Sequence, residues 1–172
     1  EEGSIKEIEK KMINIIFKFD DINTSEIATP RRDMVMVDSK LRIKDAMKAF
    51  LKKNHTRMPV YEKNRDNIVG IVHVKDLIVH MEGKNKNNTV SKIMYKPYFV
   101  PEVKKISDLM KQFQKRKEHM AIVVDEHGSI TGLVTMEDAL EEIVGEIMDE
   151  TDMIAPNIKK IDKNTWIVNG KT

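Results

Sequence analysis

The sequence predicts an α/β fold in which two copies of one β-α-β-β-α unit pack face to face. The first observation is the stretch 132–138, where a short apolar strand runs through a glycine into Thr135, and Asp138 follows at the start of an apolar-periodic helix. The second observation is a degenerate copy of this stretch at 68–76, with its glycine 62 residues upstream. One unit alone is too small to bury both faces of its sheet, so two units are expected to pack pseudo-symmetrically around a cleft.

The composition is that of a folded, well-solvated domain, and it excludes several classes of function. The 172 residues suffice for one domain or for two small ones with a shared core, and 40% are hydrophobic against 34% charged. A net charge of +2 gives no electrostatic reason to expect nucleic-acid binding. The absence of cysteine excludes disulfide scaffolds, thiolate catalysis and cysteine-based zinc sites. No apolar run approaches the ~20 residues that cross a bilayer.

The first unit is expected at 24–82, after a linker segment at 1–23 that contains an amphipathic helix at 4–18. The unit opens with an extended lead-in at 27–31, because the residue before Pro30 disfavours helix. Its remaining elements follow from apolar periodicity and turn-forming residues: a strand at 34–37, a helix opened by Asp38 and Ser39, a strand at 57–61, a turn at 63–67, a strand at 68–72 and a helix at 74–81.

The second unit, expected at 90–152 after a polar hinge at 83–89, repeats this order. Its elements are a lead-in at 93–97, a strand at 98–100, a helix across 106–113, a strand at 119–124, a turn at 125–128, a strand at 130–134 and a helix at 136–147. A tail at 153–172 ends in a strand at 166–168 with a hairpin signal at 169–170, and we interpret it as the start of a truncated further domain. Both ends of the chain are expected to be cuts from a longer protein.

Three features together resemble paired cystathionine-β-synthase (CBS) domains, also called a Bateman module. These are the twofold repeat, the Gly-x-x-Thr-x-x-Asp pattern at 132–138 and the strand that begins Arg57-Met58-Pro59-Val60. Four further segments are similar to the CorC/HlyC group of haemolysin-like magnesium and cobalt transport proteins: 29–31, 73–77, 119–126 and 141–147.

The resemblance implies a parent protein with an N-terminal membrane domain, a cytosolic CBS pair and a small C-terminal domain. This chain would then be a cytoplasmic domain of a membrane-anchored protein. In that group the CBS pair binds an adenine nucleotide, ATP or AMP, often as a homodimer, and is linked to divalent-cation transport. The resemblance leaves open whether Mg²⁺ accompanies the nucleotide.

Thr135 and Asp138 are the main candidates for contact with the nucleotide. A carboxylate can accept hydrogen bonds from both hydroxyls of a ribose, and a threonine hydroxyl can bond a ribose or phosphate oxygen. The helix N-terminus behind them favours an anion. Glu137, between them, is either a further contact or a solvated helix residue. The structural alternative is that Thr-x-x-Asp is a helix capping box, in which both side chains serve backbone N–H groups.

In this fold the ribose motif of one unit is expected to work with the lead-in and second strand of the other. The resulting adenine slot would be lined through backbone and apolar contacts by Thr29, Met58, Pro59 and Val60. Met58 and Val60 could equally be core residues.

His119 begins a strand, and it is expected either to face the phosphates, to which it could donate a hydrogen bond, or to be a surface histidine. The first unit carries His73 where the second has Thr135. With Asp76 and Arg57, His73 would make a possible second, weaker nucleotide site.

The predicted function is ligand sensing rather than catalysis. No Ser/His/Asp, Cys/His or metal-centred constellation is visible. No metal site is predicted, because His73, His80 and Asp76 lack a recognisable ligand spacing. A nucleotide would favour one packing of the units and thereby bias the attached membrane domain. The alternative is a structural or dimerisation module with a degenerate, ligand-free cleft.

Overall fold

The structure is a computed structural model that describes residues 20–53, 55–81, 87–149, 158–160 and 166–168. The helix expected at 4–18 and the hairpin signal at 169–170 lie outside the described residues. Within the described part, no helix is both long enough and apolar enough to span a membrane.

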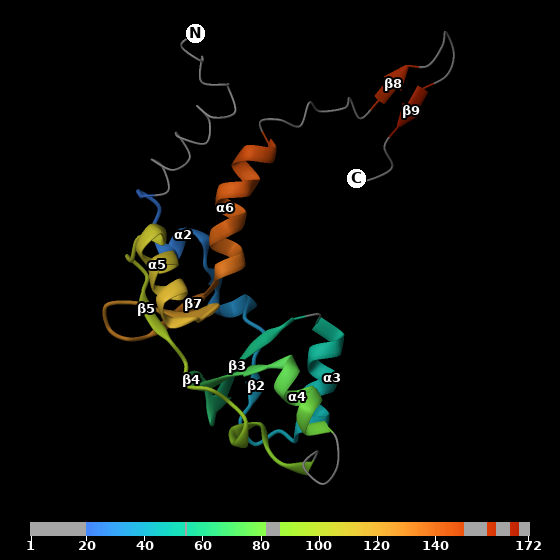
Figure 1. Ribbon diagram of the computed structural model, residues 1–172, viewed down its shortest axis with the longest axis vertical. Helices are drawn as coiled ribbons and strands as arrows, with labels where there is room; N and C mark the ends of the chain where they lie inside the picture. The colour runs from blue at the N-terminus through green and yellow to red at the C-terminus, as the bar shows by residue number, and fades with distance from the viewer. Residues whose placement is uncertain (1–19, 54, 82–86, 150–157, 161–165, 169–172) are drawn as a thin grey trace.

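Two sheets form the two halves of the fold (Figure 1). The first sheet has the order β2-β3-β4, and its strands are β2 (Val37–Asp38), β3 (Arg57–Glu62) and β4 (Asn64–His73). Helices α3 (Ile43–Lys53) and α4 (Val74–Met81) belong to this half. In it β2 runs parallel to β3, and β3 and β4 form an antiparallel hairpin.

The second sheet repeats this plan and adds one strand. Its order is β1-β7-β6-β5, and its strands are β1 (Thr29–Pro30), β5 (Phe99–Pro101), β6 (Met120–Val124) and β7 (Ile130–Thr135). Strand β5 is parallel to β6, and β6 is antiparallel to β7. Helices α5 (Ile106–Arg116) and α6 (Met136–Asp149) belong to this half. The predicted α/β fold of two repeats is therefore confirmed.

Short elements complete the structure. They are α2 (Thr24–Ile27), η1 (Arg31–Asp33) and η3 (Val90–Lys92). The tail contains β8 (Ile158–Lys160) and β9 (Trp166–Val168), which pair with each other as an antiparallel two-stranded sheet.

The two repeats exchange their lead-in segments. Strand β1, at the start of the first repeat, pairs with β7 of the second repeat, with Thr29 opposite Leu133. In the counterpart arrangement, Tyr95 of the second repeat bridges to Ile71 of β4, and each backbone N–H bonds to the other residue's carbonyl at 2.9 Å. Each structural half therefore contains the beginning of the other half's sequence repeat.

Gly132 and Gly70 lie where these lead-ins cross. A Cβ atom added at Gly132 would lie 2.5 Å from the carbonyl oxygen of Thr29. At Gly70 it would lie 2.5 Å from the Sδ atom of Met94. Both distances are far below van der Waals contact, so each glycine lets the other repeat's lead-in approach closely. The paired glycines seen in the sequence thus mark the two crossings.

Three apolar clusters form the core, and one of them joins the two halves. One lies inside the first half around Ile43, Phe50 and Met58, and one inside the second half around Leu109 and Phe113. The third joins the two sheets face to face and comprises Met34, Ile68, Ile71, Met120, Ile122, Ile130 and Leu133. Its members come from β4, β6, β7 and the segment before β2, so the contact between the two sheets is apolar.

Three predicted elements differ from the structure. The helix expected to open at Asp38 and Ser39 begins only at Ile43, because residues 39–41 form a turn instead. The strand expected at 34–37 is reduced to Val37–Asp38, because the carbonyl of Met34 accepts a hydrogen bond from Arg65 Nη2 at 2.7 Å instead of pairing in the sheet. The turn expected at 63–67 is wrong, since β4 already begins at Asn64 and the chain reverses at Lys63, with φ of 66°. The polar residues that suggested a turn form the exposed end of a long strand.

Replacing glycine by alanine is expected to destabilise the fold more at Gly132 than at Gly70. Gly132→Ala is expected to lower the free energy of unfolding by about 1–3 kcal/mol, because its Cβ meets backbone that cannot move without breaking the β1–β7 pairing. Gly70→Ala is the matched control and should cost less, since it meets a flexible methionine side chain. Urea unfolding of both variants measures the difference. Equal losses would show that the close approach at Gly132 does not constrain the fold.

Candidate functional site

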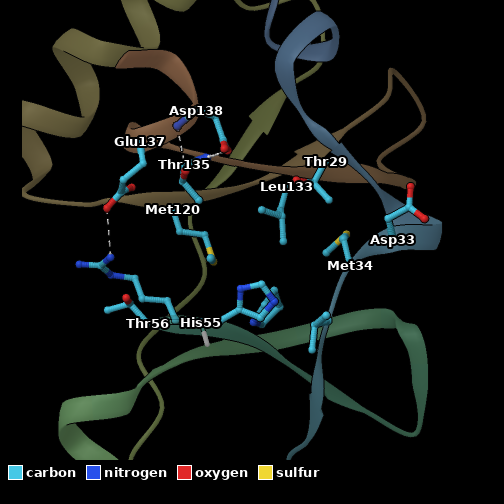
Figure 2. A pocket seen from close by; sticks show the side chains of 13 residues that line it. Thr29, Asp33, Met34, His55, Thr56, Met120, Leu133, Thr135, Glu137 and Asp138 are labelled. Carbon is cyan, nitrogen blue, oxygen red and sulfur yellow. Dashed lines mark hydrogen bonds and ion pairs between the residues drawn. The ribbon is translucent and has the colours of Figure 1, made fainter. Parts of the chain in front are cut away.

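A cleft of about 320 Å³ lies between the two halves, at the N-terminus of α6 (Figure 2). We call it the first cleft. Its walls come from β1, η1, the segment after it, the start of β3, and strands β6 and β7. The lining residues are Thr29, Asp33, Met34, Val35, His55, Thr56, Arg57, Pro59, Met120, Leu133, Thr135, Glu137 and Asp138.

Thr135 and Asp138 form a reciprocal capping box at the start of α6. The backbone N–H of Asp138 donates to Thr135 Oγ1 at 3.1 Å, and the backbone N–H of Thr135 donates to Asp138 Oδ2 at 2.7 Å. The structural alternative for this motif is thus realised, yet both side chains also line the first cleft. The two bonds use one carboxylate oxygen and one hydroxyl lone pair, so Asp138 Oδ1 and the hydroxyl proton can still serve a ligand.

The polarity of the lining side chains differs between the two ends of the first cleft. Figure 2 shows Thr135, Glu137 and Asp138 gathered at one end. The apolar Leu133 and Met34 lie toward the other end, where β1 crosses, together with the carboxylate of Asp33. A polar grip beside an apolar slot is the arrangement that a ligand with a sugar and a planar ring requires.

An ion pair joins the two halves across the first cleft. Arg57 Nη1 in β3 lies 3.7 Å from Glu137 Oε1 in α6. The Arg57 side chain is 22% exposed, whereas that of Glu137 is 64% exposed. Such a solvated pair stabilises the fold by at most about 1 kcal/mol, so an anionic ligand can replace Glu137 at little cost.

The structure brings five of the predicted nucleotide-site residues together in the first cleft: Thr29, Pro59, Thr135, Glu137 and Asp138. It does not bring Met58 and Val60 there. Both are fully buried in the core of the first half, because successive side chains of β3 point to opposite faces of the sheet. Arg57 and Pro59 are on the cleft face, and this alternation could have been applied to the sequence.

His119 also lies elsewhere. It lines a second cleft, of about 370 Å³, while its neighbour Met120 lines the first. Sequence reasoning missed seven lining residues of the first cleft: Asp33, Met34, Val35, His55, Thr56, Met120 and Leu133. Leu133 could have been found, since it alternates with Thr135 along one strand. Asp33 ends the short 3₁₀ helix η1 and His55 lies in a loop, and neither segment carries a periodic signal.

The second cleft contains the residues predicted for a weaker site. It is lined by Arg57, Ile71, His73, Lys75, Asp76, Tyr95, Lys96, Lys117, Glu118 and His119. Here His73 replaces threonine as the helix cap, and its Nδ1 accepts a hydrogen bond from the Lys75 backbone N–H at 2.9 Å. Asp76 does not complete a capping box; its Oδ1 accepts a hydrogen bond from the Tyr95 hydroxyl at 3.2 Å.

Burial and nearby cations lower the pKa of His73 below its usual value. Burial is the largest cause, followed by repulsion from Arg57, while Asp76 acts in the opposite direction. Lys75 and His119 add smaller repulsions. The carboxylate of Asp76 raises the pKa of the Tyr95 phenol. Both effects favour a neutral His73 whose Nδ1 lone pair caps α4 and a Tyr95 that keeps its proton.

The described residues contain no group of three His, Cys, Asp or Glu side chains close enough together to hold a metal ion.

Comparison with known protein families and structures gives consistent matches. The CBS domain family matches residues 25–83 and 90–145. Hemolysin C of Brachyspira hyodysenteriae is 38% identical over 170 residues, covering 99% of this chain and 62% of its own length. The chain thus spans less than two thirds of that relative.

Two solved structures illustrate the structural similarity. The CBS domain of the bacterial CNNM/CorC family Mg²⁺ transporter in complex with ATP has a TM-score of 0.76 and 40% identity, covering 80% of this chain and 97% of that one. A CBS-domain pair with bound AMP from Klebsiella pneumoniae has a TM-score of 0.64 and 32% identity, covering 72% of this chain and 99% of that one.

The cap on α4 predicts an acid-sensitive stability. The pKa of His73 is lowered in the folded state, so below about pH 6.5 the unfolded chain binds more protons and stability falls as pH drops. His73→Asn keeps an acceptor for the Lys75 N–H but does not titrate, so this acid-dependent loss should disappear. Melting temperatures from pH 8 to pH 5 measure it. His127→Asn, in an exposed turn, is the control, and identical profiles for all three proteins would contradict the assignment.

Proposed function

Since this chain belongs to the CBS domain family and contains two tandem repeats, we propose that it senses adenine nucleotides for a membrane protein that transports divalent cations, magnesium or cobalt. The supporting observation is the capping box at the first cleft, which presents a hydroxyl and a carboxylate beside an apolar slot. The similarity to CBS domains described with ATP and with AMP supports the choice of adenine nucleotides. The role is regulatory rather than catalytic, and the transported ion belongs to the parent protein.

In this proposal the nucleotide lies along the graded first cleft. Asp138 Oδ1 accepts from the ribose hydroxyls and Thr135 donates its hydroxyl proton. The adenine ring packs on Leu133 and Met34 beside the backbone of Thr29, and the phosphates point toward Arg57. Pro59 contributes a wall, whereas Met58 and Val60 act only through the core. Mg²⁺ would arrive with the phosphates, since Mg²⁺ usually binds through substrate phosphates and a few carboxylates.

Regulation follows from the position of the first cleft between the halves. A ligand that touches α6 in one half and β3 in the other favours the relative position that satisfies both contacts. Such differential binding shifts the population of arrangements and biases whatever is attached to the chain, here a membrane domain on whose cytoplasmic side this chain would lie.

The second part of the proposal is that the chain forms a homodimer. A homodimer would also be expected if the chain were a purely structural dimerisation module, which is the alternative function. Three apolar side chains of α3 and α4 are exposed: Leu51 at 71%, Ile78 at 56% and Val79 at 69%. Val79→Glu is expected to yield monomers in sedimentation measurements if a second copy covers this face. A monomeric unmodified chain would contradict the homodimer.

Asp138→Asn tests the nucleotide site. The amide oxygen can still accept from the Thr135 N–H, so the fold is retained, but the charged acceptor for the ribose is lost. Affinity for AMP is expected to fall about tenfold or more, because a hydrogen bond to a charged group contributes about 1.5–3 kcal/mol. Isothermal titration calorimetry measures this loss.

Asp76→Asn, the same substitution at the corresponding position of the other repeat, is the control and should leave AMP affinity unchanged. Equal affinities in the Asp138→Asn and unmodified chains would refute the site. A melting temperature that does not respond to any adenine nucleotide would favour the purely structural function, because a specific ligand stabilises by mass action.

A further inference from the structure

Residues 21–25, which we call the entry segment, are bound along the turn that precedes α5. The Thr24 side chain is fully buried. Its hydroxyl and its backbone N–H both donate to the carbonyl of Lys104, at 2.8 and 2.7 Å. The backbone N–H of Ser25 donates to the carbonyl of Glu102 at 3.0 Å. These bonds fasten the entry segment to the second half of the fold.

The entry segment also caps the N-terminus of α5. Lys105, the N-cap residue of that helix in the described structure, makes no side-chain capping bond. The N–H of Ile106, the first residue of α5, instead donates to the carbonyl of Ile22 at 3.1 Å. Lys105 Nζ donates to the carbonyl of Asp21 at 2.6 Å, across 84 residues of sequence. Because the first N–H groups of a helix lack partners within the helix, the start of α5 depends on the entry segment.

The chain stays with the second half after the entry segment. Helix α2 contacts β7 and α6, and β1 pairs with β7. Helix α6 belongs to the same half and contacts α5 (Figure 1). Both segments that lead out of the two repeats, before residue 20 and after Asp149, therefore attach to the second half. The first half is connected along the chain only to the second half.

The contacts between the two halves are of a different kind. They include two solvated ion pairs, Arg31 with Asp66 and Arg57 with Glu137. Such pairs contribute little to stability. The apolar cluster between the two sheets is the larger contact, and apolar contact is not directional. The halves can therefore shift slightly against each other at lower cost than the entry segment can leave α5.

We propose that the entry segment, α5 and α6 form one rigid unit, and that a ligand in the first cleft moves the first half relative to this unit. The second part rests on the proposed nucleotide function. The ligand would touch β3 in the first half and the start of α6 in the rigid unit. The distance between the two segments that lead outward is then the same with and without ligand. The position of the first half is what reports that the cleft is occupied.

Pairs of spin labels test this division, and the absence of cysteine allows them to be placed at chosen positions. Labels on Asp21→Cys and Glu141→Cys report the distance from the entry segment to α6. Labels on Lys52→Cys and Glu141→Cys report the distance between the halves. All three native side chains are exposed. In double electron–electron resonance, saturating AMP should leave the first distance unchanged and shift the second by about 2 Å or more. Equal shifts in both would overturn the proposal.

Thr24→Val tests the rigid unit without any ligand. The substitution removes the hydroxyl bond to Lys104, whereas Thr24→Ser retains it and is the matched control. In Thr24→Val, hydrogen exchange of the Ile106 amide should be up to about tenfold faster. The distribution of distances from the entry segment to α6 should broaden, and that between the halves should not. Unchanged exchange and an unchanged distribution in Thr24→Val would overturn the rigid unit.

The two proposals fail in different ways. If calorimetry detects AMP binding but neither distance changes, the inferred movement is overturned and the nucleotide site stands. If AMP does not bind and Thr24→Val broadens only the distance from the entry segment to α6, the nucleotide site is refuted and the rigid unit is supported.

Discussion

The close crossing of β1 over β7 is the constraint on which the rest of this structure depends. Thr29 can pair with Leu133 only because Gly132 leaves room for the Thr29 carbonyl. The pairing draws the start of the first repeat into the second sheet and positions Thr29 at the wall of the first cleft. In the reciprocal crossing Met94 lies over Gly70 and Tyr95 pairs with Ile71, which brings Tyr95 within reach of Asp76. Both clefts therefore owe part of their lining to segments exchanged between the repeats.

The capping box at α6 shows how one pair of side chains can hold the start of a helix and also line a cleft. Thr135 and Asp138 each give one hydrogen-bonding position to a backbone amide and keep another unused in the cap, and both residues line the first cleft. From sequence spacing alone, helix capping and ligand contact are alternative roles for these two side chains. The spacing does not show which lone pairs stay unused once the cap has formed. A ligand held in this way is coupled to the start of a helix, which is a rigid attachment through which to act on the neighbouring parts of the chain.

Elements with strong periodicity were predictable, and sites that depend on tertiary contacts were not. The helix Val74–Met81 and the strand through Leu133 follow directly from apolar spacing. The polar residues from Asn64 onward led to the wrong prediction of a turn, because an exposed strand end and a turn have similar polar sequences. Of the candidate site residues, those at the strand–helix junction line the first cleft, whereas Met58 and Val60 do not, because their side chains lie on the core face of β3. Asp33 and His55 are brought in by packing between the halves, which no local pattern encodes.

The exchange of lead-in segments also bears on how such a protein could have arisen. A single repeat taken alone would lack the strand that Thr29 contributes from the other repeat, and its glycine would face an empty position. An ancestor with only one repeat would have needed a second copy of itself to supply this strand. The two copies would have formed a homodimer in which each contributed its first strand to the sheet of the other. Gene duplication and fusion would then have converted this contact between molecules into a contact within one chain, after which the side chains that line the two clefts were free to diverge.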